Sequence, residues 1–369
     1  MTQVIRILMA GGGTGGHVYP AIAIADAIRR LDQRTAIEFA GTQDRMEWQA
    51  VPKAGYAIHP ITVTGFQRRL TARNLAFPFK LLSGFMQSWN LIGAFDPDVV
   101  VGTGGYVSGP VLLSASLRGR PIVIQEQNAF AGATNRMLAK RATQIHVAFP
   151  EAERAFPKEK IMLSGNPTRK ELLNVDGAAA RAYYEVPEGA DVLLVFGGSL
   201  GSAALNGAVQ RRLDELLQSE KLYVIWQTGS QYYVRVKAQA PEHPRLRLLQ
   251  YIDRMDYAYA AADLVLCRAG AITCSELMVT GTPSILVPSP NVTADHQTKN
   301  ARSMETAGAA LLLPEADLDD QLVPLVTGLM REPERRRKMS EGALRIAKPD
   351  AAEEIARHVL RLAGWQEQP

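Results

Sequence analysis

The spacing of apolar residues changes repeatedly along the first half of the chain. Segments such as 20–31 and 132–140 have the 3.6-residue period of amphipathic helices. Between them lie short apolar runs typical of buried strands, and strands that alternate with helices are typical of βαβ units around a parallel sheet. The first half is therefore predicted to form a Rossmann-like α/β domain, with strands at 4–9, 36–40, 98–102, 122–125, 143–147 and 161–164.

The same pattern starts again in the middle of the chain. The segment DVLLVFGGSLGSAALNGAV at 191–209 runs from an apolar strand through glycines into a helix, and strand-like runs follow at 223–226, 246–249, 264–267 and 284–287. The simplest architecture is α/β, with two Rossmann-like domains whose parallel sheets face each other across a cleft. We predict an N-terminal domain at 1–165, a second domain at 166–350, and a C-terminal helix at 351–369 that could pack back on the N-terminal domain or on the second.

The composition changes this picture little. The 369 residues are 47% hydrophobic and 21% charged, which is ordinary for a globular protein and enough for two hydrophobic cores. Cys267 and Cys274 cannot form a disulfide framework, so we interpret them as packing thiols of a cytoplasmic protein. The short apolar start is unlike a signal peptide, and no uncharged apolar stretch approaches ~20 residues, so no membrane span is expected. Neither a metal site nor a cofactor is predicted.

The charge is unevenly distributed along the chain. Residues 1–165 contain 18 Lys and Arg against 11 Asp and Glu, whereas the remainder contains 23 against 26. The basic first half indicates an anionic partner for that half. Residues 48–95 contain no acid at all, and their cations are Lys53, Arg68, Arg69, Arg73 and Lys80.

Within this acid-free stretch, apolar side chains recur at helical spacing. Such a stripe usually faces a hydrophobic core. The flanking cations and the missing acids favour instead a surface that lies on anionic lipid. We therefore predict a membrane-associating patch formed by Leu75, Phe79, Leu82, Phe85 (or Met86) and Trp89, together with Arg68, Arg69, Arg73 and Lys80.

The first glycine loop, GGGTGGH, follows the first predicted strand and opens a helix. It can be a plain tight turn, or its backbone N–H groups can face an anion or a sugar hydroxyl. Gly11, Gly13 and Gly16 match the dinucleotide-binding spacing, but the next strand ends in FAGTQDR, where Asp44 comes too late for the ribose acid. His17 stands at the helix start, where the dipole disfavours imidazolium. A neutral imidazole there can accept a proton from an attacking hydroxyl.

The second glycine loop, FGGSLGS at 196–202, has the same relation to its strand and helix. A diphosphate there would receive N–H donors and the Ser199 hydroxyl without a metal. Arg169, in GNPTRKE, can supply a bidentate cation. Glu276, early in the helix after the strand at 264–267, can accept ribose hydroxyls or simply compensate a helix dipole.

Other polar or glycine-rich loops also follow predicted strands. They are GTGGYVSGP at 102–110, QEQNAFAG at 125–132 and ADHQTKNA at 294–301. Several such loops on one rim of a sheet indicate an active site more strongly than any one of them does.

Eight of these motifs, in this order along the whole chain, resemble the MurG family of peptidoglycan glycosyltransferases: GGGTGGHVYPAIAIA, DVVVGTGGYVSGPV, QEQN, GNPTR, FGGSLGS, YIDRM, CRAGAITCSE and DHQTKNA. The resemblance implies a GT-B fold and metal-independent, inverting transfer of GlcNAc from UDP-GlcNAc to the muramyl 4-hydroxyl of lipid I, giving lipid II. It also implies a peripheral location on the cytoplasmic face of the inner membrane, with cell-wall synthesis and division proteins as further partners and no nucleic acid.

The resemblance also assigns residues. The donor-binding set comprises Arg169 and Ser199 on the diphosphate, Ile252 on uracil, and Ala271, Ile272, Thr273, Cys274, Ser275 and Glu276 around the diphosphate and ribose. It continues with Gln297 and Asn128 on the GlcNAc hydroxyls, and with Thr14, Gly15 and Gly16 closing over the donor. His17, Gly104, Gly105, Tyr106, Glu126 and Asn128 line the acceptor side. His17 is favoured as general base and Glu126 is the rival.

Three positions depart from the usual family forms. Leu200 stands where Gln is usual, Ala269 where Ser is common, and Gln125 where His usually precedes EQN. The alternatives left open are another GT-B enzyme, such as a diacylglycerol glycosyltransferase or a UDP-GlcNAc 2-epimerase, and a catalytically silent nucleotide-sugar-binding protein. An NAD-dependent oxidoreductase is disfavoured by the missing ribose acid.

Overall fold

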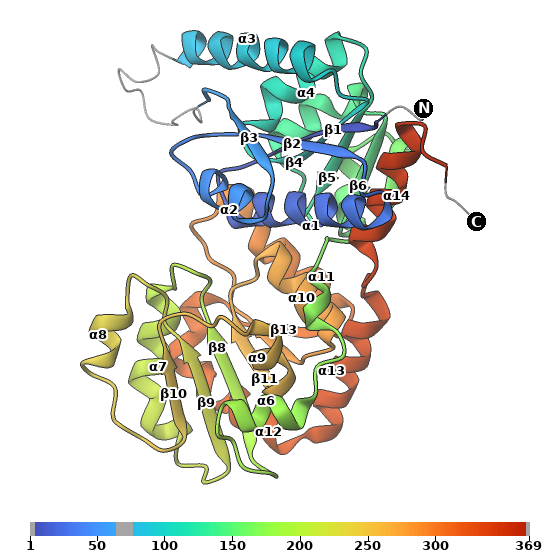
Figure 1. Ribbon diagram of the computed structural model, residues 1–369. Coiled ribbons are helices and arrows are strands. Elements are labelled where there is room, and N and C mark those ends of the chain that lie inside the picture. The colour runs from blue at the N-terminus through green and yellow to red at the C-terminus, as the bar shows by residue number, and fades with distance from the viewer. Residues whose placement is uncertain (1–3, 64–76, 367–369) are drawn as a thin grey trace. The chain divides into compact units, whose positions relative to one another are not determined.

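The computed structural model describes residues 4–63 and 77–366. The chain forms two compact units, one of Met1–Thr168 with Pro349–Pro369 and one of Arg169–Lys348. Each unit is a parallel sheet covered by helices on both faces, so the predicted α/β class is confirmed (Figure 1).

The sheet of the first unit has seven parallel strands in the order β3-β2-β1-β4-β5-β6-β7. The chain runs outward from β1 to β3 and then returns to β4 on the other side of β1. This reversal places the switch point, where ligands of open α/β sheets bind, between β1 and β4. The strands are β1 Arg6–Gly11, β2 Ala36–Gly41, β3 Ala57–Pro60, β4 Val99–Gly104, β5 Ile122–Glu126, β6 Gln144–Val147 and β7 Ile161–Leu163.

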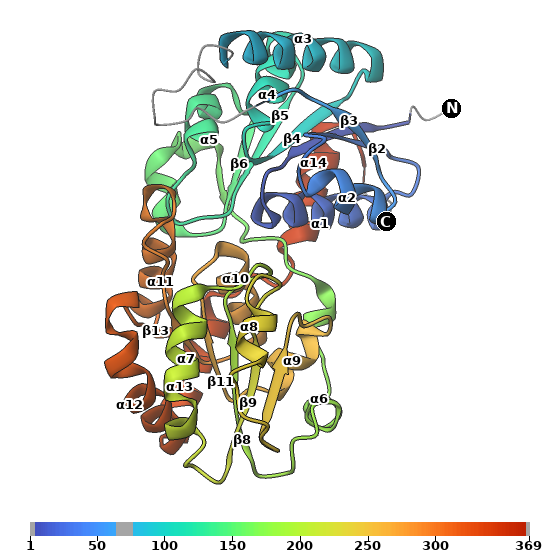
Figure 2. The same ribbon diagram turned by 90° about the vertical axis from the view of Figure 1, so that its left-hand side faces the viewer.

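Most strands of this sheet are buried on both sides because helices cover both of its faces. One face carries α1 (Gly15–Leu31), α2 (Glu47–Lys53) and α14 (Ala351–Leu362), and α14 packs against α1 (Figure 2). The C-terminal helix thus belongs to the first unit. The other face carries α3 (Phe77–Phe95), α4 (Ser108–Leu117) and α5 (Ala133–Leu138), followed by short 3-10 helices at Ala139–Arg141, Pro150–Ala155 and Lys158–Lys160.

The sheet of the second unit has six parallel strands in the order β10-β9-β8-β11-β12-β13, with its switch point between β8 and β11. The strands are β8 Asp191–Phe196, β9 Leu222–Gln227, β10 Leu246–Leu249, β11 Leu264–Cys267, β12 Ser284–Leu286 and β13 Ala310–Leu312. The helices are α6 Gly177–Tyr183, α7 Ala203–Leu216, α8 Tyr233–Lys237, α9 Met255–Ala261, α10 Ala271–Thr280, α11 His296–Thr306, α12 Leu318–Arg331 and α13 Pro333–Ile346. Short 3-10 helices lie at Lys170–Leu172, Thr293–Asp295 and Glu315–Asp317.

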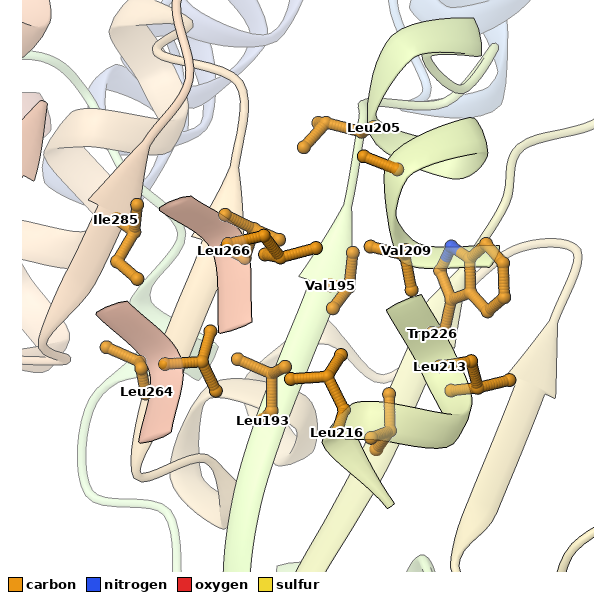
Figure 3. Packing of buried hydrophobic residues seen from close by; sticks show 14 of the residues in the cluster. Leu193, Val195, Leu205, Val209, Leu213, Leu216, Trp226, Leu264, Leu266 and Ile285 are labelled. Atoms are coloured by element: carbon orange, nitrogen blue, oxygen red, sulfur yellow. The ribbon is translucent and has the colours of Figure 1, made fainter. Parts of the chain in front are cut away.

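The core of the second unit shows how the period-2 pattern of the strands meets the 3.6-residue pattern of the helices. Leu193 and Val195 of β8 point toward α7 and pack with its Leu205 and Val209 (Figure 3). Trp226 of β9 is fully buried beside them, and its indole N–H donates to Asn206 Oδ1 at 3.0 Å. That bond satisfies the one polar atom of the side chain.

Candidate active site

Three loops meet at the carboxyl ends of β1, β4 and β5. The Gly12 N–H donates to Gly104 O at 3.3 Å. The Ser108 hydroxyl donates to Ala10 O at 2.8 Å and lies 2.7 Å from Gly104 O, so it ties the two loops together. Gly105 has φ +82°, and a Cβ there would lie 2.2 Å from Gly12 O. Only glycine fits at position 105 without moving the first loop.

His17 lies in the first turn of α1 and is half-buried. Its Nδ1 is 3.0 Å from Thr103 O and 3.0 Å from Gln127 Oε1. The Thr103 hydroxyl donates to His17 O at 2.7 Å, so this residue holds both the ring and the main chain of His17. A Cβ on Gly104 would lie 2.8 Å from Nδ1, which explains why a glycine stands beneath the imidazole.

Glu126 ends β5 and is 1% exposed. Its carboxylate accepts from the main-chain N–H groups of Asn128 (3.1 Å) and Gly132 (2.9 Å), from Asn135 Nδ2 (2.8 Å), and more weakly from Asn128 Nδ2 (3.5 Å). Four N–H donors therefore hold this carboxylate, and the carboxylate in turn organises the loop from 126 to 132.

Glu47 belongs to this site, although sequence reasoning missed it. It is fully buried on α2 and accepts from the Gly13 N–H at 3.0 Å and the Thr42 N–H at 3.2 Å. The Gly13 N–H is thereby used inside the protein. At the start of α1, neither a side-chain cap at Thr14 nor an acid in the first turn covers the helix end. The helix start at 14–16 is therefore suited to an anion or a sugar oxygen.

The remaining acceptor-side residues lie on the same edge of the first sheet. Tyr106 follows Gly105 and is 63% exposed, so its ring is accessible. Asn128 is half-buried on the Glu126 loop. The structure thus brings His17, Gly104, Gly105, Tyr106, Glu126 and Asn128 onto three adjoining loops.

In the second unit, the loop after β8 is the counterpart of the first glycine loop. Gly198 and Gly201 have φ values of +92° and +85°, and the Gly201 N–H donates to Gly198 O at 2.9 Å. This tight turn leaves Ser199 and Leu200 exposed ahead of α7. Leu200, where the family usually has Gln, therefore presents its apolar side chain to solvent, 59% exposed.

Arg268 supports this loop from behind and was not predicted. Its guanidinium donates to the Ser202 hydroxyl at 2.7 and 3.0 Å and pairs with Glu315. Ser202 also caps α7 by accepting from the Leu205 N–H at 3.4 Å. A cation is thus fixed close to the start of α7, directly behind the glycine loop.

Arg169 and Glu276 are brought together by the fold. Arg169 Nη2 lies 3.1 Å from Glu276 Oε1, and the Tyr259 hydroxyl donates to Glu276 Oε2 at 3.1 Å. Burial raises the pKa of the Glu276 carboxyl, and Arg169 and Tyr259 partly offset that effect. Burial likewise raises the pKa of Tyr259, so its hydroxyl stays protonated and donates. The Arg169 side chain is itself half-exposed.

Gln227, at the end of β9, links two of the predicted donor segments and was also missed. Its Oε1 accepts from the Ile252 N–H at 3.1 Å, and its Nε2 donates to Gly198 O at 2.9 Å. The N–H of Ile252 is thus already engaged within the protein. Any contact of Ile252 to a base would use another atom.

The remaining predicted donor residues surround the start of α10. This helix follows Gly270 with no side-chain cap. Gln297 Oε1 accepts from the Ser289 N–H at 2.8 Å. Cys274 is buried, and burial raises the pKa of its thiol to about 12, as expected for a packing thiol. In this stretch Ala271, Cys274, Ser275 and Glu276 are buried, while Ile272 and Thr273 are half-buried.

The predicted membrane patch is divided by the structure. Leu75, Arg68, Arg69 and Arg73 lie outside the described residues. On α3, Phe79 is 76% exposed, Leu82 61% and Met86 48%, and Lys80 is exposed beside them. Phe85 and Trp89 are half-buried, their ring centroids are 5.9 Å apart, and the Arg118 guanidinium lies 4.2 Å from the centroid of the Trp89 ring. Of the two residues considered at one position of the stripe, Met86 rather than Phe85 faces solvent.

None of the helices in the described part of the chain combines the length and the apolar character that a membrane span requires. No group of three or more His, Cys, Asp or Glu side chains among residues 4–63 and 77–366 is arranged to hold a metal ion.

Comparisons with known proteins show the family of the chain. The glycosyltransferase family 28 N-terminal domain matches residues 7–147, and the C-terminal domain of the same family matches residues 192–355. A Salinibacter ruber protein named UDP-N-acetylglucosamine–N-acetylmuramyl-(pentapeptide) pyrophosphoryl-undecaprenol N-acetylglucosamine transferase is 62% identical over 98% of both chains. A Flavobacterium psychrophilum protein of the same name is 42% identical, again over 98% of both chains.

Solved structures give the same result at the level of the fold. The crystal structure of Acinetobacter baumannii MurG superposes with a TM-score of 0.79 at 30% identity, covering 97% of this chain and 99% of that one. A UDP-GlcNAc 2-epimerase from Neisseria meningitidis superposes with a TM-score of 0.69 at 12% identity, covering 97% and 100%. The second likeness concerns the fold alone.

Proposed function

The chain belongs to the MurG family within glycosyltransferase family 28, and from this we infer that it makes lipid II by transferring GlcNAc from UDP-GlcNAc to lipid I. The arrangement that carries the detailed proposal is the pair of glycine loops at the two switch points. One lies beside a histidine, and the other lies on the sheet edge that also holds an arginine–carboxylate pair.

We assign the nucleotide sugar to the second unit. The loop at 197–201 and the uncapped start of α10 offer N–H groups, the Ser199 hydroxyl is exposed, and Arg169 is half-exposed on the same sheet edge. Such donors stabilise the charge that develops on a leaving diphosphate. We therefore expect the reaction to proceed without a divalent ion. Glu276, already held by Arg169 and Tyr259, is positioned to accept from the ribose.

We assign the acceptor sugar to the first unit and general-base catalysis to His17. In an inverting transfer the acceptor hydroxyl attacks the anomeric carbon on the face opposite UDP and loses its proton to a base. Glu126 is less suited to that task because four N–H donors already hold its carboxylate. We interpret Glu126 as the residue that shapes the acceptor loop.

We also propose that α3 places the enzyme on the cytoplasmic face of the inner membrane. The exposed side chains of Phe79, Leu82 and Met86 form an apolar surface with Lys80 beside it. An anionic bilayer attracts such a basic, apolar surface. Lipid I is a membrane-anchored substrate, so this location would bring its sugar to the first unit.

The first experiment is transfer of labelled GlcNAc from UDP-GlcNAc to a short-chain lipid I analogue in the presence of EDTA. Turnover is expected to continue, and Mg²⁺-dependent recovery would show that metal independence is wrong while leaving the transferase assignment intact. Binding of UDP-GlcNAc without any transfer, with or without metal, would overturn the transferase assignment itself. In the same assay His17→Ala is expected to lower kcat by roughly 10²-fold or more.

The rival base is tested in the same assay. Glu126→Gln replaces one carboxylate oxygen by a donor and is expected to raise KM for the acceptor more than it lowers kcat. A normal kcat in His17→Ala together with a large loss in Glu126→Gln would reverse the assignment of the base.

A further inference from the structure

We propose that Gln127 is a positioning residue that holds His17 as its Nδ1–H tautomer and leaves Nε2 unprotonated to receive the acceptor proton. This inference rests on the proposed role of His17 as general base. Gln127 is 1% exposed and follows Glu126, the last residue of β5.

The orientation of the Gln127 amide is determined by its surroundings. Its Nε2 lies 2.5 Å from Thr103 O and 3.2 Å from Gln125 O, and it also contacts Gln125 Oε1. Main-chain carbonyl oxygens only accept hydrogen bonds, so the NH₂ group must face them. A flipped amide would oppose oxygen to oxygen at two contacts. The Oε1 atom therefore faces His17 Nδ1, at 3.0 Å.

The tautomer of His17 follows from this orientation. Both atoms within 3.0 Å of Nδ1, Thr103 O and Gln127 Oε1, are acceptors. The proton of a neutral imidazole must then reside on Nδ1, and the lone pair is on Nε2. Within residues 4–63 and 77–366, Nε2 makes no hydrogen bond. It is thus the nitrogen available to the substrate.

Two further amides support Gln127 from behind. Gln125 is fully buried, and because its Oε1 accepts from Gln127, its Nε2 is directed to Asn166 Oδ1 at 2.8 Å. Asn166 is 2% exposed and donates through Nδ2 to Gln127 O at 3.0 Å. Gln127, Gln125 and Asn166 thus form a closed circuit of hydrogen bonds. No member of this circuit is ionisable, so no titration of its own members reorients it. Such chains of buried hydrogen bonds strengthen one another.

The circuit has a defined part in the chemical step. The acceptor O–H proton passes to the Nε2 lone pair as the oxygen bonds to the anomeric carbon. The bond from that carbon to the UDP oxygen breaks, and its electron pair leaves with the diphosphate. His17 becomes imidazolium while Nδ1–H still donates to Thr103 O and Gln127 Oε1. These two acceptors stabilise the positive charge as it forms. Loss of either acceptor should therefore lower kcat rather than raise the KM for the donor.

The direct test is the tautomer itself. In protein labelled with ¹⁵N-histidine, long-range ¹H–¹⁵N spectra distinguish Nδ1–H from Nε2–H, and His17→Gln identifies the His17 signals among six histidines. The folded wild-type protein is expected to show the Nδ1–H form. An Nε2–H form for His17 would overturn the proposal, whatever the activity of any variant.

The second test uses two variants at one position. Gln127→Leu removes one of the two acceptors opposite Nδ1, leaving Thr103 O alone, and is expected to lower kcat about ten- to hundredfold and to raise the fraction of the Nε2–H form. Gln127→Glu keeps an oxygen opposite Nδ1 and is expected to retain the Nδ1–H form, but its second oxygen then opposes Thr103 O and Gln125 O, so no recovery of kcat is expected. The matched control is Gln144→Leu, which should leave kcat unchanged. Gln144 is the first residue of β6 in the same unit, and its Oε1 has no partner among the described residues.

The outcomes separate this inference from the proposed function. If His17→Ala keeps near-normal turnover, the proposed base is wrong, although the tautomer result still stands as a measurement. If His17→Ala is inactive while Gln127→Leu keeps both kcat and the Nδ1–H form, Gln127 does not position the base and the inference fails. The Nε2–H form of His17 in the Gln127→Glu variant would also contradict it.

Discussion

Acidification is expected to destabilise the first unit through a single buried histidine. His146 on β6 is fully buried, and its Nδ1 lies 2.9 Å from the Ser164 hydroxyl, which itself donates to Glu354 Oε1 of α14 at 2.9 Å. Its Nε2 has no partner among the described residues, and the His358 ring stacks on it at 5.3 Å between centroids. Burial, with repulsion from His358, lowers the pKa of His146 to about 3.

The size of the effect follows from proton linkage. In the unfolded chain a histidine has a pKa near 6.5, so below that pH the unfolded state takes up a proton that folded His146 refuses until about pH 3. Above pH 6.5 His146 is neutral in both states, and the free energy of unfolding has its full value. Below pH 6.5 the free energy of unfolding decreases as the pH falls. Between pH 8 and pH 5 the free energy of unfolding should fall by about 2 kcal/mol from this residue. Any native pKa below about 4 gives the same loss at pH 5.

Urea unfolding at pH 8 and pH 5 measures this loss. Trp226 is in the second unit, so a Trp226→Phe background leaves tryptophan fluorescence to report on the first unit alone. In that background His146→Gln cannot titrate, and it should lose about 2 kcal/mol less than the parent between the two pH values. Equal losses in the two proteins would refute the reasoning. The remaining tryptophans are Trp48, Trp89 and Trp365.

Three further predictions concern the loops, the patch and the thiols. Gly105→Ala places a Cβ 2.2 Å from Gly12 O at φ +82°, so it should cost at least about 1–3 kcal/mol in urea unfolding and most of the transferase activity. Phe79→Glu should weaken sedimentation with anionic liposomes, whereas Val234→Glu, which is 82% exposed in the second unit, should not; equal binding would remove α3 from the membrane contact. Cys274, whose thiol pKa is raised to about 12 by burial, should react with a thiol reagent only in denaturant, and rapid labelling of the native protein would contradict that pKa.

The repeating part of the fold could be predicted because its signals are local. Apolar runs followed by glycines and an amphipathic helix identify β1 with α1 and β8 with α7, and those units set the α/β class. The strands β3 and β13 were not predicted. Ala57–Pro60 is partly exposed at a sheet edge and has no apolar run, and Ala310–Leu312 is only three residues long. Short edge strands exist because of their neighbours, which a local pattern does not contain.

The candidate site could likewise be predicted only where the sequence signal is local. The glycines, His17 and Ser199 follow strands directly, so the sequence predicts that they lie at the sheet edge. Glu47 and Arg268 could not, because each acts on a loop distant from it in sequence: Glu47 on the Gly13 N–H, and Arg268 on the Ser202 hydroxyl. Their residue types alone suggest an exposed helix start and a surface cation, and only the fold shows that Glu47 is fully buried and that Arg268 is held by Ser202 and Glu315.

The charges of these supports differ between the two units, which bears on how the reaction is divided. In the second unit, Arg268 holds the Ser202 hydroxyl at the start of α7 and is itself paired with Glu315. The N–H groups of the glycine loop and of the helix start, without a buried carboxylate left unpaired beside them in the described part of the chain, favour the developing negative charge of a leaving diphosphate. Behind the first-unit loops stand two buried carboxylates, Glu47 and Glu126, together with acceptors on His17 Nδ1. That surrounding favours an imidazole that gains a proton, so the electrostatics of the hidden residues support the same assignment as the exposed ones: leaving group on the second unit, base on the first.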